Sequence, residues 1–371
     1  MKIWIDCRMY STNFTWIWRY VYELISYLAK NDQENEYVLF FNEPHYTSFE
    51  LPNPKWKKVL ANTRHYTVKE QTVFLYKLLK EKLDLMHFTH FNAPILYKKP
   101  FVVTIHDLTL SFYPGKKMTR SYHRFGYNLT INKVVKNAMK IIAVSEHTKK
   151  DIIEILNIPE EKISVIYEGI KKEEFMRPSQ EDIDNQKLKF NIKNEYIYYT
   201  WVLREHKNLV RLIKAYAELV EEWLEEDLVI TWKEDYTYFE VRDMIIAKKL
   251  QWRIHLPWFV TNKELVGFYA WSRAFVFPSL YEWFWLPVLE AMATWTPIAC
   301  SNISSIPEIA WENWAVFFNP LSIESIKQWI RTVLHDKLIR DMLIKNWYKR
   351  IEDFKWENMW KEILELYINT K

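Results

Sequence analysis

Two glutamates, Glu282 and Glu290, stand eight positions apart in a stretch suited to binding a phosphorylated, hydroxyl-rich ligand. The stretch begins as an apolar strand, breaks into a loop after Phe277, and restarts as a helix near Pro287, because proline suits the first turn of a helix. Free amides at a helix start that follows a parallel strand bind phosphate. Flanking carboxylates can accept hydrogen bonds from hydroxyl groups. The stretch therefore predicts a nucleotide-sugar site.

The whole string around these glutamates resembles a known signature. Residues 277–293 read Phe-Pro-Ser-Leu-Tyr-Glu-Trp-Phe-Trp-Leu-Pro-Val-Leu-Glu-Ala-Met-Ala, which is similar to the motif of glycosyltransferase family 4. The resemblance implies retaining transferases of the GT-B fold, an α/β architecture of two Rossmann-like domains facing a cleft. The family writes Glu-Gly-Phe-Gly-Leu-Pro, so Trp283 and Trp285 stand where it has glycine.

The resemblance also implies roles for these residues. Glu290 would bind the ribose hydroxyls of the donor, and Glu282 would act on the donor sugar as a catalytic residue. The amides of residues 284–286 (Phe284, Trp285 and Leu286) would face the phosphates. The template of a retaining hydrolase, in which one of two carboxylates about 5 Å apart is a nucleophile, does not carry over. A plain solvated glutamate is the alternative interpretation of each carboxylate.

A charged turn follows the predicted strand 195–200. Arg204 and Lys207 lie there, and cations at a strand-to-helix turn suit a diphosphate and can supply the charge that a metal carries elsewhere. The family has similar Arg and Lys residues. Arg204 is slightly off the usual position, so Lys207 is the stronger candidate, and a solvated charged turn is the alternative. The turn 256–260, with Val260, resembles the one that holds the nucleotide base.

His106 and Asp107 end the predicted strand 101–105, at the edge where open α/β sheets place ligands. The resemblance puts a catalytic histidine at this place, close to the transferred sugar. A hydrogen-bonded capping pair is the alternative interpretation.

The loop after the first strand contains Trp16, Trp18 and Arg19. It resembles the family sequence Thr-Gly-Ile-Gly-Arg-Tyr, a loop that faces the leaving diphosphate and the acceptor. Glycine lets the backbone approach phosphate closely, whereas two indoles would fill that space. A surface turn with stacked aromatic rings is the alternative.

Metal and cofactor signals are weak. His87-x-x-His90 alone is not a metal site, and Asp-x-Asp in a matching sheet context is absent. We therefore expect a metal-independent enzyme. We also expect no cofactor, because the sugar donor is a substrate. Gly-x-Gly-x-x-Gly does not follow the first strand, which argues against a nicotinamide dehydrogenase.

Glycine is scarce and tryptophan abundant. The chain has 4 Gly and 19 Trp, whereas usage of about 7% Gly would give roughly 26. We infer that many family glycine positions carry Trp, and a naturally Trp-rich protein is the alternative. The positions are Trp4, Trp16, Trp18, Trp201, Trp232, Trp258, Trp283, Trp285, Trp295, Trp311 and Trp314.

Short apolar strands alternate with amphipathic helices, which is typical of βαβ units and parallel sheets. We expect an acceptor-binding Rossmann-like domain over residues 1–170 and a charged linker over 171–192. A nucleotide-sugar-binding Rossmann-like domain follows over 193–371, and its terminal helices pack back toward the first domain.

Charge and cysteine content favour a reduced compartment. Net charge is +4, too weak to indicate nucleic acid, and the two cysteines, Cys7 and Cys300, form no disulfide framework. A signal peptide and membrane spans are not evident, so we expect a cytoplasmic protein. Basic, aromatic segments at 70–83 and 113–124 are most simply packing helices with solvated lysines. The alternative is peripheral contact with the inner membrane face, which carries a lipid-linked acceptor.

The resemblance implies transfer of a hexose, mannose or glucose, from a nucleoside diphosphate sugar to a glycan or lipid-linked acceptor, as in polysaccharide biosynthesis. The alternative from another class is a binding or scaffold protein of the same fold whose donor cleft is filled by indoles. The sequence leaves the donor base, the linkage and the oligomeric state open.

Overall fold

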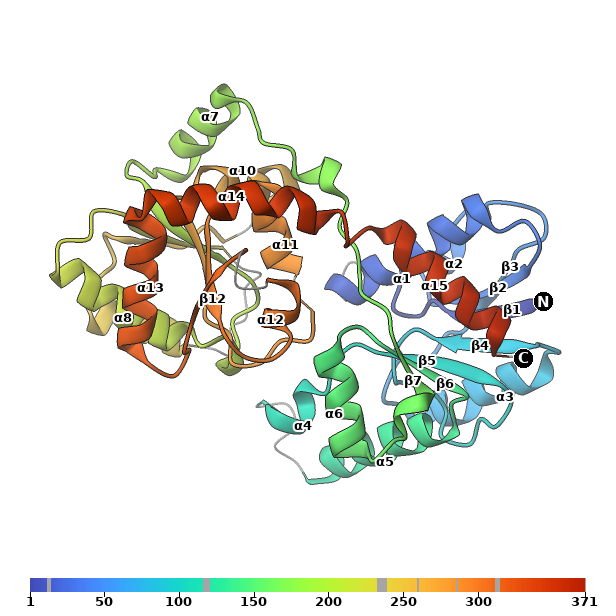
Figure 1. The fold of residues 1–371 in the computed structure, drawn as a ribbon. Coiled ribbons are helices and arrows are strands. Elements are labelled where there is room, and N and C mark those ends of the chain that lie inside the picture. The colour runs from blue at the N-terminus through green and yellow to red at the C-terminus, as the bar shows by residue number, and fades with distance from the viewer. Residues whose placement is uncertain are drawn as a thin grey trace. The chain divides into compact units, whose positions relative to one another are not determined.

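The computed structural model describes residues 1–11, 15–115, 121–231, 239–258, 260–284, 286–310 and 314–370. The chain divides into two compact units. The first combines Met1–Gly169 with Trp356–Lys371, and the second is Ile170–Lys355. The chain therefore crosses between the units twice, as the ribbon shows (Figure 1).

The first unit contains a seven-stranded sheet in the order β3-β2-β1-β4-β5-β6-β7. Every pair of neighbours is parallel, and β1 pairs with β2 and β4 on its two sides. Strands buried on both faces read as apolar runs, as β5 does with all five residues buried. The strands are β1 (Lys2–Asp6), β2 (Glu36–Phe41), β3 (Lys57–Leu60), β4 (Leu85–Phe88), β5 (Phe101–Ile105), β6 (Lys140–Ala143) and β7 (Ile163–Val165).

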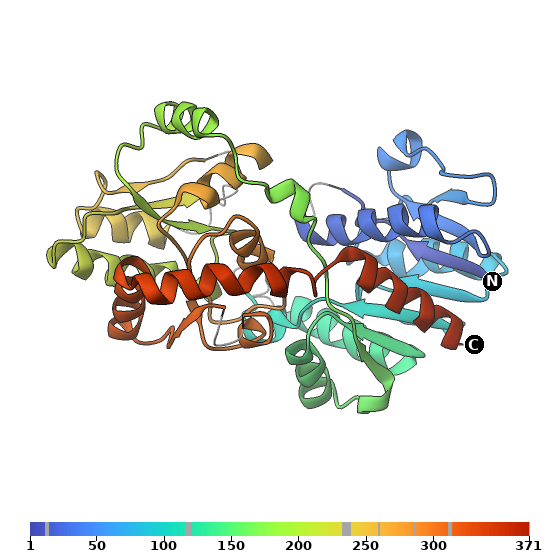
Figure 2. The same cartoon turned by 45° about the horizontal axis from the view of Figure 1, so that its top comes forward.

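Helices cover both faces of this sheet (Figure 2). One core cluster joins the sheet to α3, α5 and α6, and the other joins it to α1 and the C-terminal helix α15. The helices are α1 (Thr15–Asn31), α2 (His45–Ser48), the π-helical turn η2 (Glu70–Phe74), α3 (Leu75–Lys80), α4 (Thr109–Phe112), α5 (Ser121–Asn137), α6 (Glu146–Leu156), the 3-10 turn η4 (Glu160–Lys162) and α15 (Trp356–Asn369).

The second unit contains a six-stranded parallel sheet in the order β10-β9-β8-β11-β12-β13. The strands are β8 (Tyr196–Thr200), β9 (Asp227–Thr231), β10 (Ile254–His255), β11 (Ala274–Phe277), β12 (Ile298–Ser301) and β13 (Val316–Phe318). The expectation of two parallel α/β domains is confirmed.

Helix α8 of this unit packs beside α9 and α13, and α11 packs beside α10 and α14. The helical elements are η5 (Lys172–Phe175), α7 (Gln180–Phe190), η6 (Glu205–Lys207), α8 (Leu209–Glu221), α9 (Glu240–Ala247), α10 (Asn262–Trp271), α11 (Leu286–Ala293), α12 (Ile306–Ile309), α13 (Ile323–His335) and α14 (Lys337–Ile351).

Local signals explain several helix starts. The Ser145 hydroxyl accepts a hydrogen bond from the amide of Thr148 and caps α6, which confirms the expected cap. Thr261 and Glu264 form a reciprocal capping box at α10. Each cap satisfies backbone amides that the helix itself leaves free.

Both sheets reverse their strand order at one place, between β1 and β4 in the first unit and between β8 and β11 in the second. In open parallel sheets, the crevice outside the carboxyl ends of the strands at such a point receives the ligand. The topology therefore selects the loops after these four strands as the places to search for sites.

Three segments differ from the sequence expectations. The segment 171–192, expected as a linker, belongs to the second unit and includes α7, whose Gln186 donates to the carbonyl oxygen of Glu264. The helix expected at 70–83 is a π-turn followed by the short helix α3. Of the last three helices, only α15 belongs to the first unit.

Two tryptophans occupy left-handed positions directly after helices. Trp223 follows α8 with φ of 72°, and Trp295 follows α11 with φ of 61°. In both places the tryptophan amide bonds to the carbonyl three residues back at 3.1 Å, and the next amide bonds to the carbonyl five residues back at 2.9 Å. This is the Schellman pattern, whose left-handed residue is usually glycine. A side chain there strains the backbone.

We predict that Trp223→Gly and Trp295→Gly each raise the free energy of unfolding by about 1 kcal/mol, because glycine adopts positive φ without a steric penalty. The two indoles are 88% and 54% exposed, so their removal costs little packing. Urea unfolding followed by circular dichroism measures the change.

Alanine at the same two positions removes the indole but keeps the Cβ, so it should stabilise less than glycine. Trp252→Gly is the matched control, because Trp252 is also exposed but has no positive φ. Equal effects of glycine and alanine would show that the indole, and not the backbone, causes the strain.

Candidate active site

The loops after β8 and β11 place a lysine against a glutamate. Strands β8 and β11 are neighbours, and Lys207 Nζ lies 2.6 Å from Glu282 Oε1. The two side chains are only 4% and 1% exposed. A buried ion pair is stable only where its geometry offsets the desolvation of both charges. The structure thus brings together two of the predicted site residues, which lie 75 positions apart in the sequence.

Asn208 holds these two loops together. Its side-chain amide donates to the carbonyl oxygens of Pro278 at 3.0 Å and Pro320 at 2.8 Å. Asn208 itself has φ of 59°, a left-handed conformation that asparagine tolerates better than most residues. The sequence analysis missed Asn208, although its position directly after Lys207 was a usable signal.

A histidine between the predicted cations has a depressed pKa. Burial first, and then the charges of Lys207 and Arg204, lower the pKa of His206 to about 2. His206 is therefore neutral, and its carbonyl oxygen accepts a hydrogen bond from the amide of Leu280 at 2.7 Å. This bond is a second link between the β8 and β11 loops.

Two serines fix the backbone of Glu282. The Glu282 amide donates to Ser304 Oγ at 3.0 Å. The hydroxyls of Ser304 and Ser305 donate to the Glu282 carbonyl oxygen at 2.6 and 3.0 Å. Both backbone polar groups of Glu282 are therefore satisfied by side chains from the loop after β12. The sequence analysis did not identify these serines.

Glu290 lies one turn into α11 and is buried. The Tyr269 hydroxyl donates to Glu290 Oε2 at 2.9 Å. Burial, and then the charge of Glu290, raise the pKa of Tyr269 well above its ordinary value, so this hydroxyl keeps its proton. Glu290 is thus held by a donor from α10 and is not a solvated surface residue. Its role toward ribose stays a prediction.

The other predicted donor-binding residues differ in exposure. Phe284 and Leu286 are buried, Val260 is half-buried and Arg204 is exposed. Trp285 lies outside the described residues. The Trp201 ring lies 5.4 Å from Lys207 Nζ, within the range of a cation–π contact.

His106 follows β5 in the first unit and is buried. Its Nδ1 lies 3.2 Å from Glu168 Oε1, and its Nε2 lies 3.0 Å from the carbonyl oxygen of Thr89. Asp107 accepts a hydrogen bond from the amide of Thr109, as in a capping turn. Both ring nitrogens of His106 therefore have partners inside the first unit, and its contact with sugar stays a prediction.

The predicted loop containing Trp16, Trp18 and Arg19 is the first part of α1, because this helix begins at Thr15. Tryptophan and isoleucine favour a helix more than the glycines of the family pattern would. Trp18 stacks on Tyr22 with ring centroids 5.5 Å apart, and Arg19 Nε lies 2.9 Å from Glu23 Oε1. The side chain of Trp16 lies outside the described residues.

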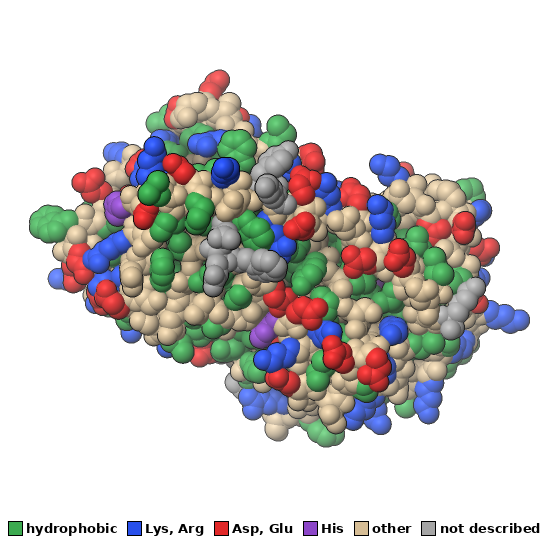
Figure 3. Space-filling model, viewed as in Figure 1, with side chains coloured by type: hydrophobic (Ala, Val, Ile, Leu, Met, Phe, Trp, Pro, Cys, Tyr) green, Lys and Arg blue, Asp and Glu red, His purple; other side chains and the backbone are tan. Residues whose placement is uncertain are grey.

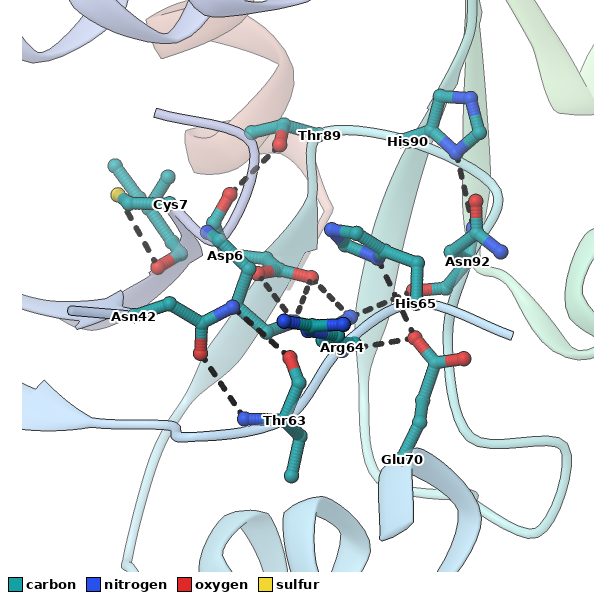
Figure 4. Close-up of polar contacts among 12 residues, drawn as sticks. Asp6, Cys7, Asn42, Thr63, Arg64, His65, Glu70, Thr89, His90 and Asn92 are labelled. Carbon is teal, nitrogen blue, oxygen red and sulfur yellow. Dashed lines mark hydrogen bonds and ion pairs between the residues drawn. The ribbon is translucent and has the colours of Figure 1, made fainter. Parts of the chain in front are cut away.

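The first sheet carries an unpredicted ionic cluster at its switch point. Arg8, two residues after β1, bonds through Nη2 to Asp6 Oδ2 at 2.7 Å and through Nη1 to Glu70 Oε1 at 2.8 Å. Nη2 also donates to the carbonyl oxygen of Asn92 at 2.8 Å. Figure 4 shows Asp6, Glu70 and Asn92 converging from separate segments. The signal in the sequence was a charged pair directly after the first strand.

Burial and neighbouring charges shift the pKa values of the groups in and around this cluster. Burial raises the pKa of Glu70, but hydrogen bonding to His65 and the charge of Arg8 outweigh it, so the pKa lies below its ordinary value. Burial, and then Arg8, lower the pKa of His65. Burial also lowers the pKa of His90. The two histidines are thus neutral beside a cluster of two carboxylates and one guanidinium.

Two surveys of the described residues were negative. The parts of the chain that the structure describes hold no group of three or more His, Cys, Asp or Glu side chains arranged for a metal ion. Within the same ranges, none of the helices combines the length and hydrophobicity needed to span a membrane.

Known proteins resemble this chain in sequence and in fold. The O-antigen chain mannosyltransferase B of Escherichia coli is 25% identical over 394 residues, which cover 99% of each chain. Anabaena Alr3699/HepE in complex with UDP-glucose superposes with a TM-score of 0.76 at 16% identity, covering 100% of both chains. Sucrose-phosphate synthase from Thermosynechococcus elongatus has a TM-score of 0.76 at 17% identity, covering 100% of this chain and 98% of that one.

Family models match both halves of the sequence. Residues 17–174 match Glycosyltransferase Family 4, and residues 180–350 match Glycosyl transferases group 1. The two matches together reach from α1 to α14, and the chain belongs to glycosyltransferase family 4, the GT-B glycosyltransferases.

Proposed function

We propose that this glycosyltransferase moves a hexose, mannose or glucose, with retention from a nucleoside diphosphate sugar to a glycan or lipid-linked acceptor. The observation that carries the proposal is the buried pair of Lys207 and Glu282 at the switch point of the second sheet, with Glu290 on the helix that follows. The names of the relatives support the substrate class, because one is an O-antigen mannosyltransferase and one was solved with UDP-glucose.

In this proposal each polar group has one task. Lys207 and Arg204 neutralise the diphosphate, and the amides at the start of α11 (Phe284, Trp285 and Leu286) add hydrogen bonds. Glu290 accepts hydrogen bonds from ribose hydroxyls, and Glu282 accepts them from the sugar. Val260 contacts the base.

The donor is a substrate, and the proposed enzyme uses no cofactor or metal, since the cationic side chains supply the positive charge. Charge develops on the leaving diphosphate in the transition state, so fixed cations act most strongly there. His106 is a catalytic residue close to the transferred sugar in this proposal. The segment with Trp16, Trp18 and Arg19 faces the leaving diphosphate and the acceptor.

The alternative is a non-catalytic binding or scaffold protein with the same fold. It is favoured by the Trp201 ring beside Lys207, because an indole there competes with a diphosphate for the ammonium group. The two functions differ in one measurable outcome, which is turnover of a nucleotide sugar.

A thermal-shift panel of GDP, UDP and ADP sugars tests the donor site. We expect one donor family to raise the melting temperature, because a ligand that binds only the folded state stabilises it. Lys207→Ala should abolish the shift. Lys248→Ala, at an exposed lysine after α9, is the control and should keep it.

The panel is then repeated with a Trp201→Gly variant, which removes the ring beside Lys207. If none of the sugars shifts the melting temperature of either protein, the donor assignment is contradicted.

Glu282→Gln and Glu290→Gln test the chemistry with the donor found in that panel. We expect both to lower kcat/KM for transfer by about tenfold or more, since each replaces a charged acceptor with a neutral amide. Sugar release and product anomer, followed by NMR, measure rate and stereochemistry. An inverted product anomer would exclude retention, and unchanged rates in both variants would remove these glutamates from the site.

We also propose peripheral contact of the first unit with an anionic membrane surface. Helices η2, α3 and α5 bury their inner sides in one core cluster, and their outer sides expose Val73, Tyr76, Leu79, Tyr122, Phe125 and Leu129. Between Leu85 and Ser145 the sequence has nine Lys and Arg but only one acidic residue, Asp107. Blue Lys and Arg side chains line the lower edge of this unit in Figure 3. Apolar side chains with nearby cations suit the interface of an anionic bilayer.

We predict salt-sensitive sedimentation with liposomes that contain phosphatidylglycerol, and none with neutral liposomes. Tyr122→Ser with Phe125→Ser should weaken it several-fold, because apolar area leaves the interface. Leu188→Ser, at an exposed leucine of the second unit, is the control and should change nothing. Equal binding to both kinds of liposome, or none to either, would contradict the proposal.

A further inference from the structure

We propose that Glu168 is the positioning residue for His106: its carboxyl group holds the imidazole in one orientation and one tautomer at the carboxyl end of β5. The inference rests on the proposed function, which places His106 close to the transferred sugar. It adds Glu168, a residue that the sequence motifs do not contain. Glu168 lies in the loop after β7, three residues beyond Val165.

The ring nitrogens of His106 have partners of different kinds. Nε2 lies 3.0 Å from the carbonyl oxygen of Thr89. A carbonyl oxygen can only accept, so Nε2 must carry a hydrogen. Nδ1 faces Glu168 Oε1 at 3.2 Å, and both side chains are 1% exposed. The tautomer therefore follows from the hydrogen-bond network.

A neutral pair satisfies this geometry at the lowest cost. Burial raises the pKa of Glu168 and outweighs the interaction with His106, which lowers it, so the net shift favours the protonated form. A protonated carboxyl group donates to Nδ1, which then accepts, and no charge is buried without water. The other oxygen, Oε2, has no hydrogen-bond partner among the described residues, as suits an uncharged carbonyl better than a carboxylate oxygen.

Other neighbours also contact the ring and the backbone of His106. The Tyr20 ring meets the imidazole edge-on, with centroids 4.9 Å apart, and the Tyr20 hydroxyl pairs with Thr104. The Thr148 hydroxyl donates to the backbone carbonyl of His106 at 3.3 Å. Burial lowers the pKa of the nearby His87 to about 3. The Thr89 carbonyl oxygen and Glu168 together thus select the tautomer of His106, the first by requiring a hydrogen on Nε2 and the second by donating to Nδ1.

Glu168 lies near the end of the first segment of the first unit. The first unit ends at Gly169, and the amide of the next residue, Ile170, donates to the carbonyl oxygen of Phe354 beside the second crossing. The contact between Glu168 and His106 therefore lies next to the segment by which the chain leaves the first unit.

The test compares Glu168→Gln with Glu168→Ala. Glutamine keeps an N–H donor for Nδ1, so we expect the wild-type tautomer in ¹⁵N NMR of labelled histidine and kcat within a few-fold of wild type. Alanine removes the donor. The Thr89 carbonyl oxygen then selects the tautomer without Glu168, so we expect a measurable fraction of the other tautomer. We also expect kcat to fall about tenfold, with an unchanged KM for the donor sugar. Glu161→Gln, at an exposed glutamate before β7, is the matched control.

The NMR arm is independent of turnover. If the alanine variant keeps the wild-type tautomer, or if glutamine and alanine lower kcat equally, the positioning role is overturned. Melting temperatures of both variants separate this result from a general loss of folding. If the wild-type protein turns over no donor at all, the proposed function fails, while the tautomer comparison still decides the role of Glu168.

Discussion

The second unit depends on one constraint: two opposite charges, Lys207 and Glu282, must be kept out of water together. Removing either charge would leave the other buried and unpaired, which costs about 3–5 kcal/mol. The surrounding hydrogen bonds hold this pair in place. Asn208 links the two loops, and Ser304 fixes the backbone of Glu282. The site is therefore rigid because its charges are buried, and the rigidity keeps Glu282 and Glu290 in a fixed relation.

The first unit also contains buried ion pairs, formed by different residues. Both sheets have the same order around the first strand of the unit, and both place an ion pair at the reversal. Arg8 faces two carboxylates there, whereas Lys207 faces one. A guanidinium has five fixed donors and can satisfy a carboxylate on each side and a carbonyl as well. The ammonium group of Lys207 is a compact point charge, whereas the guanidinium of Arg8 is a rigid planar fork.

The sequence was sufficient for the fold and for the loop and helix that contain Glu282 and Glu290, because these follow from local signals. Alternating strands and helices predict parallel sheets, and one motif contains Glu282 and Glu290. The contacts that it could not supply join distant segments. His106 and Glu168 lie 62 positions apart and Arg8 and Glu70 also 62, and no periodicity connects them. The start of α1 was missed for a local reason, since the glycines of the family pattern, expected to keep the loop open, are Trp in this chain.

The abundant tryptophans are accommodated in different ways, which bears on function. Trp4 lies inside β1, against Phe40, and adds to the core. Trp223 and Trp295 lie at exposed helix ends, where the cost is backbone strain. Trp201 is the one of these four that contacts a predicted site residue, because its ring lies over Lys207. A cation–π contact of about 0.5–2 kcal/mol would have to be given up, or shared, when a diphosphate binds. Under the proposed function, Trp201 therefore weakens donor binding, whereas Trp223 and Trp295 strain the backbone at exposed helix ends.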